Sequence, residues 1–368
     1  MRKSLSFLAV TFLMSGMLLS YPPASEAKQS TRQYAQAGVR NNPELTRLLR
    51  EGRKLVDAGK LEEALELYQQ AAALDSRNPR IFSGIGYLYA QQGNFQESVV
   101  AYQQAIALAP NNADFHYALG FGLANLGDNA GAAAAYRRTT QLNRRHTDAY
   151  LGLGVVLVRQ EDYDGALTAY RQVATLEPKN YMPYELMGSL YLQQGRPQEA
   201  LRVLQRAAQL APRKGTVQLN LGVAWFGLRN PEAGLKALTQ AARLEPRNAL
   251  LHYKIGRIFQ LEGDLPEALT SYRKAIAARP NYIEAQNAIG EIYLTQQEFL
   301  RAIVIFRDLT SDNPDNARAH YNLGMALRGR DRLQEAGLAF DRAYTLYQQQ
   351  GNAEGMREAR AMLNELKK

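Results

Sequence analysis

A glycine recurs every 34 residues through almost the whole chain of 368 residues. The nine glycines in this register are Gly52, Gly86, Gly120, Gly154, Gly188, Gly222, Gly256, Gly290 and Gly324. At the ordinary glycine frequency of about 7%, such a register arises by chance with odds on the order of 10⁻¹⁰. A fixed period of this length is typical of proteins that stack one supersecondary unit on the next. The sequence therefore predicts a repeat array rather than two or three separate globular domains.

Other positions fall into line when each glycine is taken as position 8 of a 34-residue unit. Nine consecutive units then cover residues 45–350 without insertion or deletion. Position 20 is small, reading Ala64, Ser98, Ala132, Ala166, Ala200, Gly234, Ala268, Ala302 and Ala336. Position 24 is bulky, reading Tyr68, Tyr102, Tyr136, Tyr170, Leu204, Leu238, Tyr272, Phe306 and Phe340.

The spacing within each unit predicts two antiparallel helices. Apolar residues at positions 4, 7, 8 and 11, and again at 20, 24 and 27, follow the helical period. A turn lies between them, marked by glycine at position 15 in five units, and proline at position 32 ends the second helix in six. A glycine inside a helix costs about 0.5–1 kcal/mol relative to alanine, so position 8 needs a packing reason. We expect positions 8 and 20 to meet where the two helices cross.

This pattern closely resembles the tetratricopeptide repeat, whose large residue, Leu-Gly, aromatic, Ala, aromatic and Pro lie at the same offsets. The resemblance implies an all-α fold, an α-solenoid superhelix of tandem 34-residue helix-turn-helix repeats. The expected repeats are 45–78, 79–112, 113–146, 147–180, 181–214, 215–248, 249–282, 283–316 and 317–350. For function the resemblance says little, because the fold serves many partners.

The two ends of the array look different from its repeats. Residues 28–44 are expected to form a flexible leader, at whose end Asn42 and Pro43 resemble a helix N-cap followed by proline at the first helical position. Residues 351–368 are expected to form a C-terminal capping helix that begins after Asn352. Its apolar face would cover the last repeat and its charged face would meet water.

In this repeat family the first helix of each unit lines the concave side through positions 2, 5, 9 and 12. Carried onto this chain, those positions and their neighbours predict a partner-binding groove with an apolar, aromatic middle and a polar C-terminal end. The groove residues are Tyr87, Tyr117, Phe121, Leu151, Val155, Val158, Leu219, Phe226, Tyr253, Lys254, Arg257, Asn287 and Tyr321. An alternative is that superhelical twist places several of them in the packing between repeats.

The N-terminus has the three-part pattern of a secretory signal peptide. Arg2 and Lys3 precede an apolar run at residues 5–19, and Ser25-Glu26-Ala27 supplies a small-residue cleavage site. The run is 15 residues long, short of the roughly 20 that a spanning helix needs. Residues 1–27 are therefore expected to be a signal peptide cleaved after Ala27, with export to the periplasm or an equivalent space. An uncleaved anchor is the alternative.

No pattern in the sequence predicts catalysis, a metal site or a cofactor. The chain has no cysteine, and His116, His252 and His320 all fall at position 4 of different units, so whole repeats separate them. Structural packing or a local hydrogen bond is the favoured role for these three histidines. His146 stands apart in a loop, and no phosphate-binding loop or nucleophile motif occurs.

The function predicted from these features is a non-enzymatic, exported scaffold. It would bind a peptide or helical segment of an envelope protein in its concave groove and so aid complex assembly. The alternative is an accessory factor that handles carbohydrate in envelope polysaccharide export or cell-wall synthesis, with tyrosines stacking on sugar rings. The formal charge of +9 favours acidic partners weakly; nucleic acid is not expected for an exported protein, and membrane contact is expected to be peripheral at most.

Overall fold

A computed structural model describes residues 42–366, which are helical apart from short turns. The chain divides into two compact units, whose described residues are 42–210, the N-terminal unit, and 211–366, the C-terminal unit. Within residues 42–366 no helix is both long enough and apolar enough to cross a bilayer. The predicted signal peptide and most of the predicted leader lie outside the described residues.

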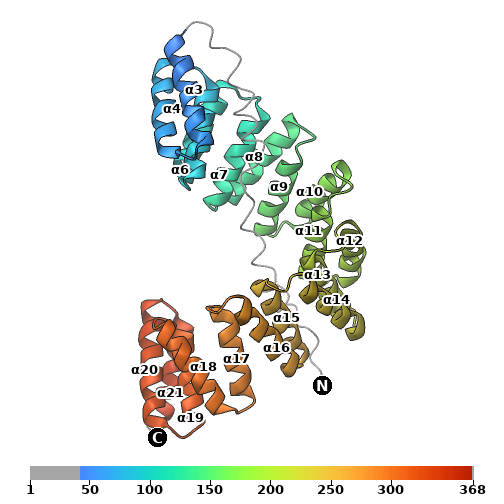
Figure 1. Cartoon of the computed structure of the whole chain (residues 1–368), viewed down its shortest axis with the longest axis vertical. Helices are drawn as coiled ribbons and strands as arrows, with labels where there is room; N and C mark the ends of the chain where they lie inside the picture. The colour runs from blue at the N-terminus through green and yellow to red at the C-terminus, as the bar shows by residue number, and fades with distance from the viewer. Residues whose placement is uncertain (1–41, 367–368) are drawn as a thin grey trace. The chain divides into compact units, whose positions relative to one another are not determined.

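The N-terminal unit contains five helix pairs in sequence order (Figure 1). They are α3 (Pro43–Asp57) with α4 (Leu61–Leu74), α5 (Pro79–Gln91) with α6 (Phe95–Leu108), α7 (Ala113–Asn125) with α8 (Asn129–Leu142), α9 (Thr147–Arg159) with α10 (Tyr163–Leu176), and α11 (Met182–Gln193) with α12 (Pro197–Leu210). The two helices of each pair pack on each other, and the second helix of each of the first four pairs also packs on the first helix of the next pair.

The C-terminal unit continues the pattern with four pairs and a last single helix. The pairs are α13 (Gly215–Gly227) with α14 (Pro231–Leu244), α15 (Ala249–Glu262) with α16 (Leu265–Ala278), α17 (Ile283–Thr295) with α18 (Phe299–Asp312), and α19 (Ala317–Arg328) with α20 (Leu333–Gln349). The single helix α21 (Ala353–Glu365) packs on α20. The predicted all-α solenoid of helix pairs with a capping helix is confirmed.

Side-chain caps fix where the helices begin. Asn42 accepts hydrogen bonds from the backbone N–H groups of Glu44 and Leu45, and Asn352 accepts one from Gly355 at 3.0 Å. Both predicted caps are therefore confirmed. The same device starts the first helix of several other repeats, at Asn78, Asn112, His146, Asn248 and Asn316. Each such cap is worth about 1 kcal/mol.

The turn inside each repeat has a left-handed residue at position 15. In five repeats this residue is a glycine, as at Gly127 with φ of 83°, where the absent Cβ removes the steric penalty. In the other four repeats it is Glu161, Arg229, Gln297 or Asp331, with φ between 57° and 62°. The turn geometry therefore holds in all nine repeats although the glycine does not.

The packing reason for the glycine at position 8 is the bulky side chain at position 24 of the same repeat. An alanine methyl at Gly86 would lie 2.9 Å from ring atoms of Tyr102. The same contact occurs within each of the nine repeats. In each one the position-24 side chain fills the space above the glycine and is itself buried. Positions 8 and 20 also meet, as expected, since the Ser98 hydroxyl donates to the Gly86 carbonyl at 2.8 Å.

The position-24 side chain also contacts the following repeat. The ring of Tyr136 lies over Gly120 in its own repeat and against Gly152 of the next, where an added methyl would come within 2.7 Å of its Cζ. Tyr68 makes the equivalent contact with Gly84. In these repeats one ring therefore joins the two helices of its own pair to the first helix of the next pair.

We expect Gly154→Ala to destabilise the protein by about 1–3 kcal/mol, because the new methyl would overlap the ring of Tyr170, which is 1% exposed. Gly337→Ala is the matched control. Gly337 is also inside a helix, but only Leu366 Cδ1, at 3.9 Å, would approach the methyl. That change should stabilise the protein by about 0.5–1 kcal/mol. Thermal unfolding followed by circular dichroism measures both, and equal effects of the two substitutions would contradict the packing role.

Candidate binding groove

The predicted groove residues all lie on first helices of repeats, but they differ in exposure. In the N-terminal unit Tyr87, Tyr117, Phe121, Val155 and Val158 are half-buried and Leu151 is buried; in the C-terminal unit Phe226, Tyr253, Arg257, Asn287 and Tyr321 are half-buried. Leu219 and Lys254 are only 3% and 6% exposed. These two side chains contribute to the packing of the C-terminal unit rather than to an open surface.

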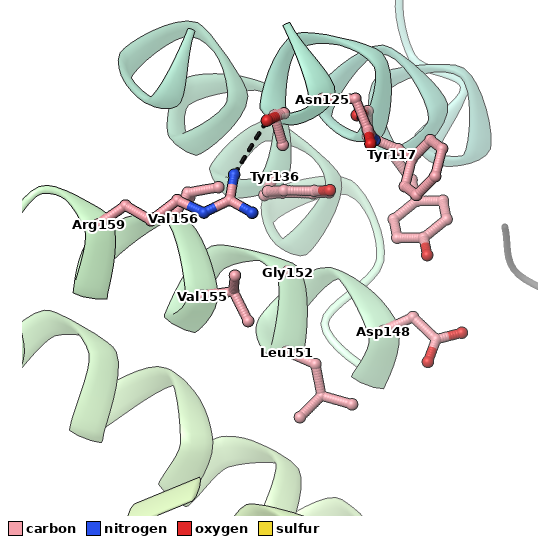
Figure 2. Close-up of a pocket in the computed structure, with 11 residues that line it drawn as sticks. Tyr117, Asn125, Tyr136, Asp148, Leu151, Gly152, Val155, Val156 and Arg159 are labelled. Carbon is pink, nitrogen blue, oxygen red and sulfur yellow. Dashed lines mark hydrogen bonds between the residues drawn. The ribbon is translucent and has the colours of Figure 1, made fainter. Parts of the chain in front are cut away.

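An open pocket lies in the N-terminal unit between α7 and α9, with Tyr136 of α8 reaching into it (Figure 2). Its empty space, which includes a part open to solvent, is about 590 Å³. The residues around it are Tyr117, Phe121, Ala124, Asn125, Tyr136, Asp148, Leu151, Gly152, Val155, Val156 and Arg159. The pocket therefore brings together Tyr117, Phe121, Leu151 and Val155 of the predicted groove, whereas Tyr87 and Val158 are not part of its lining.

Aromatic contacts hold the wall of the pocket that α7 provides. The Tyr117 ring lies 5.8 Å from the Tyr136 ring and 4.7 Å from the His146 ring, measured between centroids. The Phe121 ring meets Phe95 edge to face at 6.1 Å. Burial raises the pKa of Tyr136 well above its usual range, so its hydroxyl stays neutral. The wall is thus a preformed apolar surface in which the rings are fixed by their neighbours.

The opposite wall is one stripe along α9. Asp148, Leu151, Gly152, Val155 and Arg159 follow the i, i+3, i+4, i+7, i+11 spacing that puts side chains on one helix face. The sequence interpretation found the two apolar members of the stripe and missed the charged ones. The sequence could have indicated both charged residues, because Asp148 lies one helical turn before Leu151 and Arg159 lies one turn after Val155.

The two charged side chains of the stripe are held differently. Arg159 Nη1 donates to the Ala124 carbonyl at 2.9 Å and to Asn129 Oδ1 at 3.4 Å, so it ties the end of α9 to the end of α7. Asp148 is half-buried, and this burial raises the pKa of its carboxyl group, with His146 acting in the opposite direction. No residue with a hydroxyl, thiol or imidazole nucleophile apart from the tyrosines lines the pocket. The pocket can therefore offer apolar contact and two opposite charges.

In the C-terminal unit the predicted residues form a polar and aromatic network. Tyr253 packs on Tyr272 and Tyr282, with ring centroids 5.7 Å and 5.3 Å apart, and its hydroxyl accepts from Arg257 at 3.4 Å. Burial raises the pKa of Tyr282 to about 12. On α17, Asn287 has a buried side-chain oxygen without a hydrogen-bond partner. The ring contacts of Tyr253 therefore join α15 to α16 and to the start of α17.

The histidines at position 4 all make the same local hydrogen bond. Nε2 of His116, His252 and His320 lies 2.9–3.0 Å from the carbonyl oxygen of Pro110, Pro246 and Pro314 respectively. Each bond links the start of a repeat to the proline that ends the previous one, which confirms the structural role. His146 caps α9 through Nδ1. Among residues 42–366 no group of three or more acidic or histidine side chains is placed to hold a metal ion.

We expect His252→Ala to lower the free energy of unfolding by about 1–3 kcal/mol, because it removes the buried imidazole and its hydrogen bond to the Pro246 carbonyl. His252→Gln should retain part of the bond. Gln286 occupies the equivalent position of the next repeat and donates to the Pro280 carbonyl at 3.3 Å. Urea unfolding of the three proteins, with and without added zinc or EDTA, measures the effect. Stabilisation by zinc that is lost with His252 would contradict the structural role.

Comparisons with known proteins agree with the helix-pair repeat. Family models described as TPR repeat match residues 52–93, 86–127 and 256–297, and models described as tetratricopeptide repeat match 117–181, 157–214, 191–258 and 287–351. Together they span residues 52–351 without a gap. No curated protein sequence matches the chain at a significant level.

Several solved structures resemble the chain at low sequence identity. A tetratricopeptide repeat protein from Parabacteroides merdae is 17% identical, with 67% of this chain and 98% of that one covered and a TM-score of 0.56. The Cut9–Hcn1 heterotetramer of APC/C is 17% identical over 87% of this chain and 62% of the other, with a TM-score of 0.48. YrrB, described as a TPR protein with an unusual peptide-binding site, is 22% identical over 52% and 95%, with a TM-score of 0.43.

Proposed function

Because the chain belongs to the tetratricopeptide repeat family, we propose that it is a non-catalytic scaffold that binds a segment of a partner protein between α7 and α9. Repeats of this family typically serve as interaction surfaces rather than as enzymes. The observation that carries the proposal is the open pocket with rings of Tyr117 and Phe121 on one wall and Leu151 and Val155 on the other.

The chemistry of the pocket suits an apolar or aromatic side chain of the partner. Burying one Leu or Phe side chain contributes about 1.5–3 kcal/mol, enough to anchor a segment whose other residues add backbone contacts. Because Phe95, Tyr136 and His146 hold the aromatic wall, little ordering cost is expected on binding.

We expect the double substitution Phe121→Ser with Val155→Ser to weaken partner binding more than tenfold, because it removes one apolar side chain from each wall. Affinity capture from the native envelope fraction, with mass spectrometry of the co-eluting proteins, supplies the partner, and titration gives its affinity. Leu338→Ser is the matched control, since Leu338 is 74% exposed on α20, far along the chain from the pocket.

Partner binding that is unchanged in the double variant would contradict the pocket as the anchor. Helical content is checked for both proteins by circular dichroism, and loss of helix in the double variant would assign Phe121 and Val155 to packing instead. If the wild-type protein captures envelope glycan and the double variant does not, the carbohydrate-handling function replaces protein binding.

We further propose that the scaffold works outside the cytoplasm on an envelope partner. The support is the sequence of residues 1–27, with Arg2 and Lys3 before the apolar run and Ala27 at the end of a small-residue site. We expect the protein isolated from its native cells to begin at Lys28, which intact-mass measurement and N-terminal sequencing would show. An N-terminus at Met1 in the soluble cytosolic fraction would contradict export, whereas Met1 in the membrane fraction would indicate an uncleaved anchor.

A further inference from the structure

We infer that the exposed side of the second helices α8, α10 and α12 in the N-terminal unit binds the surface of a bilayer that contains anionic lipids. These helices belong to three consecutive repeats (Figure 1). The inference goes beyond the proposed function, because the basic residues that carry it do not line the pocket between α7 and α9.

Basic side chains accumulate on these helices without acidic ones between them. Residues 129–146, which form α8 and the loop after it, contain no aspartate or glutamate but carry Arg137, Arg138, Arg144 and Arg145. Residues 165–176 of α10 and 200–210 of α12 also lack acidic residues, since Asp164 and Glu199 lie in the first turns of these helices. The cations of this second group, with the one in the loop after α10, are Arg171, Lys179, Arg202 and Arg206. Together the eight residues are the cationic face.

The repeat brings the cationic face to one side of the array. Three pairs of its residues occupy the same position of different repeats, so stacking places the two members of each pair on the same side. The pairs are Arg137 with Arg171, Arg138 with Arg206, and Arg145 with Lys179. Tyr136, the residue before Arg137, is buried and reaches into the pocket, whereas Arg137 is exposed. The pocket and the cationic face therefore lie on different sides of α8.

The usual structural roles of surface cations do not account for this face. A basic residue in the last turn of a helix complements the helix dipole, but the last turns of α8, α10 and α12 contain none. Among residues 42–366, Arg137, Arg144, Lys179 and Arg206 form no ion pair. Arg206 bonds to Gln209, which is uncharged. A positive field of one sign is thus left on the surface, where it attracts anions.

Exposed aliphatic side chains on the neighbouring second helix, α6, favour a bilayer as the source of those anions. Val100 and Leu108 are 47% and 40% exposed, and Val100 occupies the same position of its repeat as Arg202. A bilayer accepts both kinds of side chain, because its headgroups attract basic residues and its interfacial region takes up aliphatic ones. A nucleic acid offers phosphates without such an apolar layer. The residues are spread over four helices, which suits an extended anionic surface better than a single bound segment.

The test measures binding of the protein, purified from its native cells, to sedimented vesicles. Vesicles of phosphatidylcholine are compared with vesicles of phosphatidylcholine and phosphatidylglycerol in equal amounts. The difference between them reports lipid charge alone, because any apolar contribution of the N-terminal residues acts on both. At low salt the wild-type protein should bind the anionic vesicles at least tenfold more tightly, since several basic residues act together. High salt should remove the difference.

The decisive variant replaces four residues of the cationic face that form no ion pair. Arg137→Gln, Arg144→Gln, Lys179→Gln and Arg206→Gln together should lower the affinity for anionic vesicles at least tenfold. The matched control removes the same charge from the region of α18 to α20, where each arginine has a carboxylate partner, and it should change the affinity little. The control substitutions are Arg301→Gln, Arg307→Gln, Arg332→Gln and Arg342→Gln.

Thermal unfolding shows whether each variant is folded. If the glutamine substitutions prevent folding, a charge-preserving variant with Arg137→Lys, Arg144→Lys and Arg206→Lys keeps the inference testable. This variant should bind anionic vesicles as the wild-type protein does, because lysine retains the positive charge. Loss of binding in the folded lysine variant would overturn attraction by charge.

Equal affinity of the wild-type protein for the two kinds of vesicle overturns the inference. An equal loss in both glutamine variants also overturns it, because binding would then follow net charge and not this face. Binding to polyglutamate or duplex DNA without binding to anionic vesicles would replace the bilayer with a soluble polyanion. Phe121→Ser with Val155→Ser should bind vesicles normally, so failure of the pocket and failure of the cationic face are seen in different measurements.

Discussion

The fold depends on one contact that is repeated along the chain, in which a bulky side chain at position 24 lies over the glycine at position 8. The two helices of a pair can approach closely because the glycine has no side chain, and the ring or leucine then fills the space that remains. In seven repeats the filling side chain is Tyr or Phe, and in the repeats of Gly188 and Gly222 it is Leu204 and Leu238. Because close-packed interiors tolerate neither voids nor overlap, the two positions constrain each other in every repeat.

The architecture could be predicted from the sequence because every level of it repeats. Helix positions follow from apolar spacing, helix starts from Asn42 and Asn352, and the break between repeats from proline. The contact partner of the glycine could not be predicted in the same way, because spacing shows which residues share a helix face and not which atoms fill the gap. The left-handed turns at Glu161 and Gln297 were also invisible, because neither residue type indicates that conformation; the surrounding packing imposes it.

The candidate site was predicted in part. Tyr117 and Phe121 occupy inner positions of one repeat, and Leu151 and Val155 occupy the same positions of the next repeat. The four side chains therefore meet in one pocket. Leu219 occupies the same position of its repeat as Tyr117 and is 3% exposed, whereas Tyr117 is half-buried, so position in the repeat does not by itself determine exposure. Asp148 lies at position 2, one of the inner positions of the family, but it was not among the predicted groove residues. Arg159 lies at position 13, outside those positions, and it lines the pocket because it shares one face of α9 with Leu151 and Val155. The structural role of His116, His252 and His320 could be predicted because all three fall at position 4 of different repeats. Whole repeats separate them, which leaves local hydrogen bonds as their role.

Tyr136 belongs at once to the packing and to the pocket. Its ring lies over Gly120, meets Gly152 in the next repeat and lines the space in which we place the partner. A side chain seated there would touch a junction between repeats, so its binding free energy would add to the energy needed to separate them. By mass action, a ligand that binds only the assembled junction suppresses its opening in proportion to occupancy. A bound partner would therefore slow local unfolding of these helices and the exchange of their amide hydrogens. Occupancy of the pocket could then be detected by amide hydrogen exchange of the backbone.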